Sequence, residues 1–164
     1  VSSCNLDQGQ TSAQYRSGSW SSDYEATNVL SSGGRPWHSA YGSGKNVNQW
    51  ITFDFAQPVR LSAVALSQPN GWNGAEIKKF ELRCADYDRG PWTRAAGPFT
   101  AKQQKAEQII TFESECDLSR YWRLFMYDNY GYGYITLQHI RFKTAAIVHE
   151  GVACPVGTFR DRKS

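Results

Sequence analysis

Apolar and polar side chains alternate along much of this chain, and this alternation limits the possible folds more than any other feature. In residues 49–55, Ile51, Phe53 and Phe55 alternate with a Trp, a Thr and an Asp. The same period of two recurs in three later segments, residues 80–84, 110–112 and 122–124. Side chains two positions apart share one face of a β-strand, so each segment predicts a strand with one buried face.

The alternation also predicts how the strands assemble. No stretch of useful length has the 3.6-residue period of an amphipathic helix. In the last expected strand the phase slips, because Ile135 and Leu137 share one face whereas Ile140 and Phe142 share the other; a bulge at residues 138–139 would reconcile them. Short strands between clusters of turn residues predict an all-β chain, a jelly-roll β-sandwich of about eight main antiparallel strands.

Length and charge narrow the class of protein further. A chain of 164 residues suits one domain with a short tail and can bury a sizeable core. The net charge is +3 without any run of Lys and Arg, so no nucleic-acid partner is expected, since such partners usually require a concentrated basic patch. No segment approaches the roughly 20 apolar residues of a membrane-spanning helix.

Aromatic residues are more abundant than the core of such a domain requires. They make up 14% of the chain, with six Trp and nine Tyr. Flat amphipathic side chains suit recognition surfaces, and function commonly resides in loops on a rigid scaffold. Four expected loops carry aromatic or basic residues among Gly, Ser and Asn: residues 16–23, 35–48, 68–74 and 128–133.

The sequence contains no recognisable catalytic motif. Its three histidines, His38, His139 and His149, fall in an expected loop, a strand and a connector, without metal-ligand spacing. Nucleophile-elbow, phosphate-loop and dinucleotide-binding motifs are absent, and the acidic residues are too scattered to nominate a catalytic pair. We therefore expect that the protein is not an enzyme.

The four cysteines bear on the cellular compartment. Cys4, Cys84, Cys116 and Cys154 lack the C-x-x-C spacing of a zinc site. An even number in a β-rich chain favours two disulfides and therefore an oxidising compartment. Four buried free thiols in a cytosolic protein are the alternative.

Five segments of the chain together resemble a known family. They are residues 24–30 followed by Trp-His-Ser at 37–39, the Gln-Trp-led strand at 49–61, the strand at 80–86 followed by Gly-Pro-Trp-Thr at 90–93, the Ser-Arg-Tyr-Trp-Arg strand at 119–123, and the closing strand at 137–142. Their order, over about residues 10–144, resembles the discoidin family, also called the coagulation factor 5/8 type C domain, within the galactose-binding-like β-sandwiches. Members of this family bind ligands rather than perform chemistry.

The resemblance implies a domain organisation and a disulfide pairing. Residues 1–144 are expected to form the discoidin-like domain, in which the termini approach each other. Of the three possible connectivities we expect Cys84 to pair with Cys116, because both lie on predicted core strands, and Cys4 to pair with Cys154, which would join the termini. Residues 145–164 are expected to form a connector and the start of a cysteine-rich module, because residues 154–159 resemble the first line of an EGF or ephrin-receptor repeat. The protein would then be part of a larger multidomain protein.

The resemblance also places the ligand site at one end of the sandwich, where loops gather. Trp72 lies in a turn-rich tip, where its indole could stack on a sugar ring or insert into a bilayer interface, with Asn70 and Asn73 reaching sugar hydroxyls. Arg35 and His38 are candidate hydrogen-bond donors in the second loop. The alternatives are that Trp72 folds back to cap the barrel and that the second loop is merely solvated. The complete set of expected ligand-binding residues is Trp20, Arg35, His38, Tyr41, Asn70, Trp72 and Asn73.

Other residues in the matching segments are expected to be structural. Trp37, Trp50 and Trp122 are expected to pack in the interior, and Arg123 to be an internal ion-pair partner. No cofactor is expected. Many related carbohydrate binders hold a structural calcium with an Asp and a Glu, but the corresponding positions here are Ser31 and Gln138. Hard cations prefer anionic oxygens, so calcium is not favoured, although a site built from backbone carbonyls is an alternative.

These observations favour a non-catalytic extracellular binding module, secreted or at the cell surface. Its expected ligand is carbohydrate on cell-surface or secreted glycoconjugates, including glycoproteins, in an adhesion role. Two alternatives use the same loops: binding to a phospholipid membrane surface through the loop aromatics, and protein–protein interaction within a larger receptor.

Overall fold

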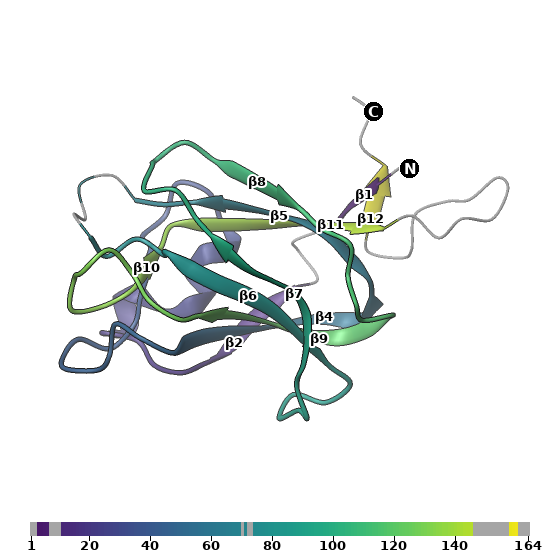
Figure 1. The fold of residues 1–164 in the computed structure, drawn as a ribbon, viewed down its shortest axis with the longest axis horizontal. Coiled ribbons are helices and arrows are strands. Elements are labelled where there is room, and N and C mark those ends of the chain that lie inside the picture. Colours follow the sequence, from purple (N-terminus) through teal and green to yellow (C-terminus); the bar gives the residue numbers. More distant parts are fainter. Residues whose placement is uncertain (1–2, 7–10, 70, 72–73, 146–157, 161–164) are drawn as a thin grey trace, which may run out of the picture.

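Two antiparallel β-sheets face each other across the hydrophobic core in the computed structural model of the protein (Figure 1). The structure describes residues 3–6, 11–69, 71, 74–145 and 158–160. The fold is an all-β sandwich, as the alternation in the sequence predicts.

The first sheet has five strands in the order β12-β1-β11-β5-β8. Its strands are β1 (Ser3–Leu6), β5 (Leu61–Ser67), β8 (Gln108–Thr111), β11 (His139–Ala145) and β12 (Thr158–Arg160). Every neighbouring pair in this sheet is antiparallel.

The second sheet also has five strands, in the order β2-β4-β9-β6-β7. Its strands are β2 (Ser12–Arg16), β4 (Gln49–Val59), β6 (Lys79–Ala85), β7 (Thr93–Thr100) and β9 (Ser119–Met126). Between β2 and β4 the chain forms two short 3-10 helices, η2 (Ser22–Tyr24) and η3 (Ala26–Leu30), and the two-residue strand β3 (Trp37–His38), which pairs with β10 (Thr136–Leu137). Among the described residues, neither helix is long and apolar enough to span a membrane.

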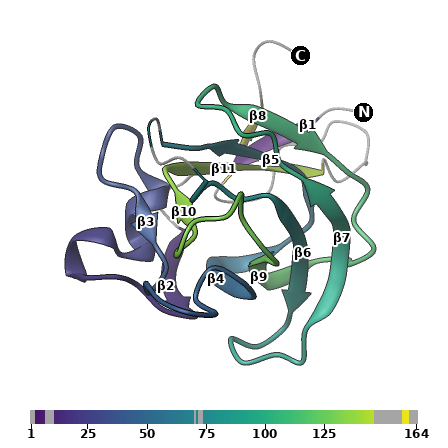
Figure 2. The same cartoon turned by 60° about the vertical axis from the view of Figure 1, so that its left-hand side comes forward.

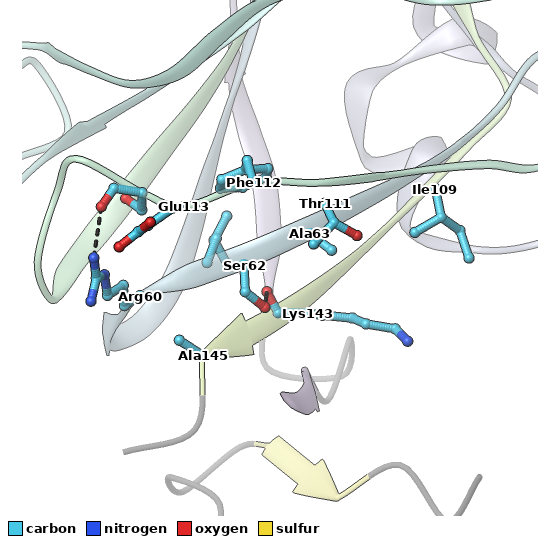
Figure 3. Close-up of a pocket in the computed structure, with 11 residues that line it drawn as sticks. Arg60, Ser62, Ala63, Ile109, Thr111, Phe112, Glu113, Lys143 and Ala145 are labelled. Atoms are coloured by element: carbon cyan, nitrogen blue, oxygen red, sulfur yellow. Dashed lines mark hydrogen bonds between the residues drawn. The ribbon is translucent and has the colours of Figure 1, made fainter. Parts of the chain in front are cut away.

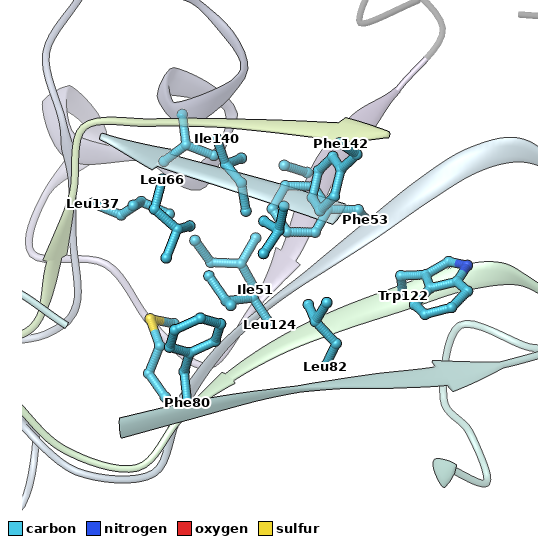
Figure 4. Close-up of a cluster of buried hydrophobic side chains, with 14 of the residues drawn as sticks. Ile51, Phe53, Leu66, Phe80, Leu82, Trp122, Leu124, Leu137, Ile140 and Phe142 are labelled. Atoms are coloured by element: carbon cyan, nitrogen blue, oxygen red, sulfur yellow. The ribbon is translucent and has the colours of Figure 1, made fainter. Parts of the chain in front are cut away.

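Strand β4 shows how the sequence pattern produces the core. Ile51, Phe53 and Phe55 point inward and are almost completely buried, and the Phe53 ring lies 4.8 Å from that of Phe142 on β11 (Figure 4). Burying one such side chain stabilises the fold by about 1.5–3 kcal/mol. Trp50 was expected to pack in the interior, but it lies on the outer face, half-buried against the Arg123 guanidinium. The two faces of this strand are therefore those that the alternation predicts.

A change of strand partner, and not the expected bulge at residues 138–139, accounts for the phase slip in the last expected strand. The chain leaves β10 at Leu137 and begins β11 at His139, so that Gln138 separates two strands with different partners. Strand β10 pairs with β3, whereas β11 pairs with β5. The interruption lets Leu137 and Ile140 both enter the core.

Cys84 on β6 forms the predicted disulfide with Cys116, which lies in the loop before β9. The second predicted disulfide, between Cys4 and Cys154, falls outside the residues whose side chains the structure describes. Trp37 and Trp122 are completely buried, as expected. Their indole nitrogens donate hydrogen bonds to the Gly18 and Ser119 carbonyls.

Strand β12 extends the first sheet beyond the expected domain boundary. Thr158–Arg160 pair with Cys4–Leu6 of β1, so this part of the tail is joined to the sandwich. The connector and cysteine-rich motif predicted within residues 145–164 otherwise lie almost entirely outside the described residues.

Candidate ligand-binding site

Four loops meet at one end of the sandwich (Figure 2). We number them in chain order: the first is residues 16–23, the second 35–48, the third 68–74 and the fourth 128–133. The first and second loops are joined by a hydrogen bond of 3.0 Å from the Trp20 amide to the His38 carbonyl. The Gly42 amide of the second loop donates to the Gly133 carbonyl at 3.3 Å, and the Tyr132 amide donates to the Gly74 carbonyl at 3.2 Å. These backbone bonds hold the loops together, and we call this region the loop end.

A stack of aromatic rings forms the centre of the loop end. The His38 ring lies between Tyr24 and Tyr134, with ring centroids 4.1 Å and 4.5 Å away and near-parallel planes. The Trp20 indole is stacked 5.6 Å from His38 and is 51% exposed, whereas His38 has no exposed surface. Trp20 thus presents a flat apolar face to solvent, supported from beneath by other rings.

The local sequence explains why His38 can be buried here. Trp37 anchors β3 in the core, and pairing with Thr136 on β10 fixes the following residue at the base of the loops. Burial lowers the pKa of His38 to about 4, so the imidazole is neutral near pH 7. Burial, assisted by neighbouring tyrosines, also raises the pKa of Tyr134 to about 12. His38 and Tyr134 are therefore both uncharged near neutral pH.

A second group of rings lies beside the stack. Tyr41 and Tyr132 are 62% and 42% exposed, and their rings meet Tyr134 at 5.9 Å and 5.0 Å in edge-on arrangements. The two exposed tyrosines border an open cavity of about 400 Å³. Its remaining lining residues are Gly42, Ser43, Gly44, Asn46, Gly131 and Gly133.

Glycine lets Tyr41 pack closely against the fourth loop. A Cβ placed on Gly133 would lie 2.8 Å from a ring carbon of Tyr41. Gly131 has a φ of +108°, which side chains rarely adopt. The Tyr-Gly-Tyr-Gly-Tyr segment at residues 130–134 thus brings the backbone close to Tyr41 and leaves the rings at the surface.

Charged side chains border the aromatic surface on one side. Arg35 lies with its guanidinium carbon 5.7 Å from the Tyr24 ring centroid and pairs with exposed Asp23 at 3.4 Å. Arg16 pairs with Glu25 at 2.7 Å. Burial raises the pKa of Glu25, but the hydrogen bonds from Arg16 and Ser19 outweigh it and leave the pKa below its usual value. This pair fixes the first loop, whereas Arg35 has an exposed guanidinium that a ligand could contact.

The structure brings four of the seven predicted ligand residues to the loop end: Trp20, Arg35, His38 and Tyr41. Trp20 and Tyr41 are exposed, while His38 lies beneath the surface, where it supports the rings. Asn70, Trp72 and Asn73 lie outside the described residues, and their roles stay predictions.

Sequence reasoning left Tyr24, Tyr132 and Tyr134 out of the candidate site. Tyr132 belongs to the loop at residues 128–133, which its composition marked as aromatic, but none of its residues was among the expected ligand-binding residues. The repeated Tyr-Gly pattern at residues 130–134 was the available signal. Tyr24 and Tyr134 could not be recognised, because only the tertiary structure places both against His38.

The segment that corresponds to the calcium position of relatives is held by an amide. The Gln138 side chain donates a hydrogen bond of 2.6 Å to the Gly34 carbonyl. An amide nitrogen thus meets a carbonyl oxygen in the segment where the resemblance would place a cation. Within the part of the chain that the structure describes, no cluster of three or more His, Cys, Asp and Glu could hold a metal ion.

A larger cavity of about 510 Å³ lies elsewhere, on the outer face of the first sheet (Figure 3). Ser62 and Ala63 form its floor, Ile109 and Lys143 lie at its sides, and Arg60 donates a hydrogen bond of 2.8 Å to the Ser114 carbonyl. None of the four described candidates of the loop end lines this cavity. Its lining combines aliphatic, polar and charged groups with the partly buried ring of Phe112.

Comparison with known proteins identifies the family. The model of the F5/8 type C domain matches residues 8–138, so the chain belongs to this family. A comparison with curated proteins finds no match.

Solved structures with the same fold include several carbohydrate-binding modules. A family 32 module from Clostridium perfringens in complex with galactose is 15% identical, with a TM-score of 0.70 over 86% of this chain and 98% of that one. Another from the same organism, in complex with GalNAc-β-1,3-galactose, is 16% identical, with a TM-score of 0.71 over 84% and 98%. A chitosan-binding module from Paenibacillus sp. IK-5 is 19% identical, with a TM-score of 0.65 over 85% and 98%.

Proposed function

We propose that the protein is a non-catalytic module that binds carbohydrate at the loop end. One observation carries the proposal: Tyr41 and Tyr132 expose aromatic rings at a cavity with polar lining residues, and Trp20 exposes its indole on the adjacent ring stack. Sugar rings have an apolar face that stacks on an aromatic ring and hydroxyls that need fixed hydrogen-bond partners. The loop end offers both kinds of group within one surface.

The expected division of roles follows from exposure and chemistry. Trp20 or Tyr41 supplies the stacking ring, and Ser43, Asn46 and the loop amides bind hydroxyls. Arg35 can donate two parallel hydrogen bonds, because its weak exposed pair with Asp23 is readily exchanged for a ligand. The neutral His38 holds the rings in position. Related modules solved with galactose and GalNAc-β-1,3-galactose support a neutral sugar as the ligand.

The setting in which the module acts is part of the proposal. The Cys84–Cys116 disulfide is typical of an oxidising compartment. We place the protein at the cell surface or among secreted proteins, as one module of a multidomain protein that attaches to glycoconjugates. The phospholipid alternative shares the exposed rings, but it has no comparable support from the related structures.

Binding to immobilised glycans tests the proposal, using galactose, N-acetylgalactosamine and chitosan oligosaccharides as probes. Tyr41→Ala and Trp20→Ala should each lower the affinity by about tenfold or more. Tyr87→Ala is the matched control, because Tyr87 is 69% exposed and lies in the turn after β6, away from the loop end. Its substitution should leave binding unchanged.

Two results would count against the proposal. If the wild type binds none of the glycans but sediments with phosphatidylserine vesicles, the lipid alternative is correct. If Tyr87→Ala weakens glycan binding as much as Tyr41→Ala does, then the loop end is not the site.

A further inference from the structure

Three arginines lie side by side on the outer face of the second sheet. Arg83 on β6 is paired in register with Arg123 on β9 on one side and with Arg94 on β7 on the other. Neighbouring strands are about 4.8 Å apart, so the row spans about 10 Å. Like charges directly opposite each other destabilise a sheet. The row therefore requires compensating interactions from neighbouring groups.

One carboxylate faces this row. Glu81 on β6 is almost completely buried and contacts Arg83 at 2.8 Å and Arg94 at 3.0 Å, and it also accepts a hydrogen bond from the Tyr127 hydroxyl. Burial alone would raise the pKa of Glu81, but these hydrogen bonds keep it below the usual value. A single negative charge thus serves two guanidinium groups.

Arg123 has no such partner among the described residues, contrary to the expectation that it forms an internal ion pair. Its Nε donates a hydrogen bond of 2.9 Å to the Thr52 hydroxyl. Burial, together with the nearby Arg83, lowers the pKa of Arg123 to about 10, which leaves it charged near pH 7. The row therefore carries three positive charges against one negative charge.

Aromatic rings hold the arginines in place. The Arg123 guanidinium carbon lies 3.7 Å from the centre of the Trp50 ring and 4.1 Å from that of Trp92. The Arg83 guanidinium lies 3.8 Å from the Phe125 ring centre. Rings stacked on the planar faces of a guanidinium leave its N–H edge for hydrogen bonding.

The turn before β7 is shaped to place Trp92 over Arg123. Gly90 has a φ of +86°, and a Cβ on it would lie 2.8 Å from the Trp92 ring. Only glycine allows the indole to lie so close to this turn. Trp92 precedes β7, and its ring reaches across the sheet to a residue of β9.

We propose that this arginine row is a second binding site, which takes the sulfate or carboxylate groups of an acidic polysaccharide. A guanidinium edge binds such groups through two parallel hydrogen bonds, and the surrounding rings reduce competition from water. A chain with repeated anionic groups can contact several arginines of the row at once. The aromatic faces are already covered by arginine, so stacking of nucleic-acid bases is not favoured. The site is independent of the loop end.

The test measures binding to two acidic polysaccharides, heparin for sulfate and polygalacturonate for carboxylate, with dextran as the neutral reference. The wild type should bind at least one acidic chain and not dextran, with an affinity that falls as salt is added. Combining Arg83→Gln with Arg94→Gln should lower that affinity by about tenfold or more. Lys105→Gln removes one exposed positive charge outside the row and should change it by less than about twofold.

Two further measurements keep the outcome decisive. Arg94→Lys keeps the positive charge but loses the planar guanidinium that donates two parallel hydrogen bonds. It should weaken binding measurably while the lysine still pairs with Glu81, a pairing that the Arg83→Gln and Arg94→Gln double variant loses. The thermal transition of each variant checks its folding. Neutral-glycan binding at the loop end should not change, so failure of this proposal is distinguishable from failure of the proposed function.

The proposal is overturned if neither acidic polysaccharide binds better than dextran, or if the folded arginine variants bind as well as the wild type. It also fails if poly-glutamate or single-stranded DNA binds as tightly and responds equally to the arginine variants, because the face would then be a general polyanion surface.

Discussion

At the scale of single residues, His38 shows how position changes the role of a side chain. In the sequence it is a basic residue of a polar loop, available to donate to a ligand. In the structure it is buried between two tyrosines, and its low pKa keeps it neutral. Its place in the site is therefore that of a support.

We predict that this burial makes stability depend on pH. The pKa of His38 is lower in the folded protein, about 4, than in the unfolded chain, about 6.5. Between these values the unfolded chain binds more protons, so stability is complete above pH 6.5 and falls by up to about 3 kcal/mol as pH approaches 4. Urea unfolding at several pH values should show this slope.

A variant separates His38 from other titrating groups. His38→Phe should flatten the slope between pH 6.5 and 5, where most carboxylates remain ionised. The pKa of His139 is also lowered by burial, so His139→Asn serves as the comparison. An unchanged slope in His38→Phe would contradict the assignment.

Two tryptophans should respond in opposite ways to truncation. Trp37→Ala should cost about 3–5 kcal/mol of stability, because the indole is fully buried and its nitrogen donates to the Gly18 carbonyl. Trp72→Ala, predicted from its turn-rich segment, should leave the melting temperature within about two degrees and abolish glycan binding. Thermal unfolding and glycan titration measure both. An unfolded Trp72→Ala protein would mean that the indole caps the barrel.

At the scale of elements, the loop end depends on where strands stop. Strands β3 and β10 are only two residues each, yet they place His38 opposite Thr136 and so hold the second and fourth loops at one base. The break at Gln138 serves the same purpose, since it lets the chain turn from β10 into the first sheet. The loops are thus anchored by short pairings rather than by their own composition.

The close contact between the fourth loop and Tyr41 gives an element-scale prediction. Gly133→Ala would place a methyl group 2.8 Å from the Tyr41 ring, which must then move away from its present position. Because Tyr41 is exposed, the cost in stability should stay below about 1 kcal/mol, whereas glycan affinity should fall about tenfold. Gly34→Ala, which meets nothing within 4 Å, is the control for both measurements.

The hydrogen bond between Gln138 and the loop at Gly34 leads to an expectation about calcium. Since an amide donates to the Gly34 carbonyl and Ser31 supplies no carboxylate, EDTA should leave the melting temperature unchanged. A rise of several degrees on adding calcium would show that carbonyls and other side chains form a site after all. Differential scanning calorimetry with and without calcium decides between them.

At the scale of the whole molecule, the two sheets carry different surfaces around one core. The outer face of the second sheet carries the arginine row, and the outer face of the first sheet has the larger cavity. The loop end lies at one end of the sandwich. The core that holds the sheets together is aliphatic and aromatic throughout (Figure 4). Each surface can therefore be changed without altering the core.

The Cys84–Cys116 bond is expected to stabilise this whole assembly. It joins residues 32 positions apart and so restricts the unfolded chain. Replacing both cysteines with alanine should lower the free energy of unfolding by about 3–4 kcal/mol. Urea unfolding of the double variant measures the loss, and an unchanged midpoint would show that the crosslink has no effect on stability.

The sandwich class, the main strands and their buried faces could be predicted from the amino-acid sequence, because a period of two assigns residues such as Phe53 and Leu82 to one face of a strand. The expected core strands also predicted the Cys84–Cys116 pairing, and the family resemblance indicated the end of the sandwich where loops gather. Only the tertiary structure decided that His38 is buried, that Tyr24 and Tyr134 enclose it, and that Arg123 lies beside Arg83. The alternation indicates on which face of a strand a side chain lies. Which residues of other strands and loops it contacts depends on the register between distant segments of the chain, which the alternation does not specify.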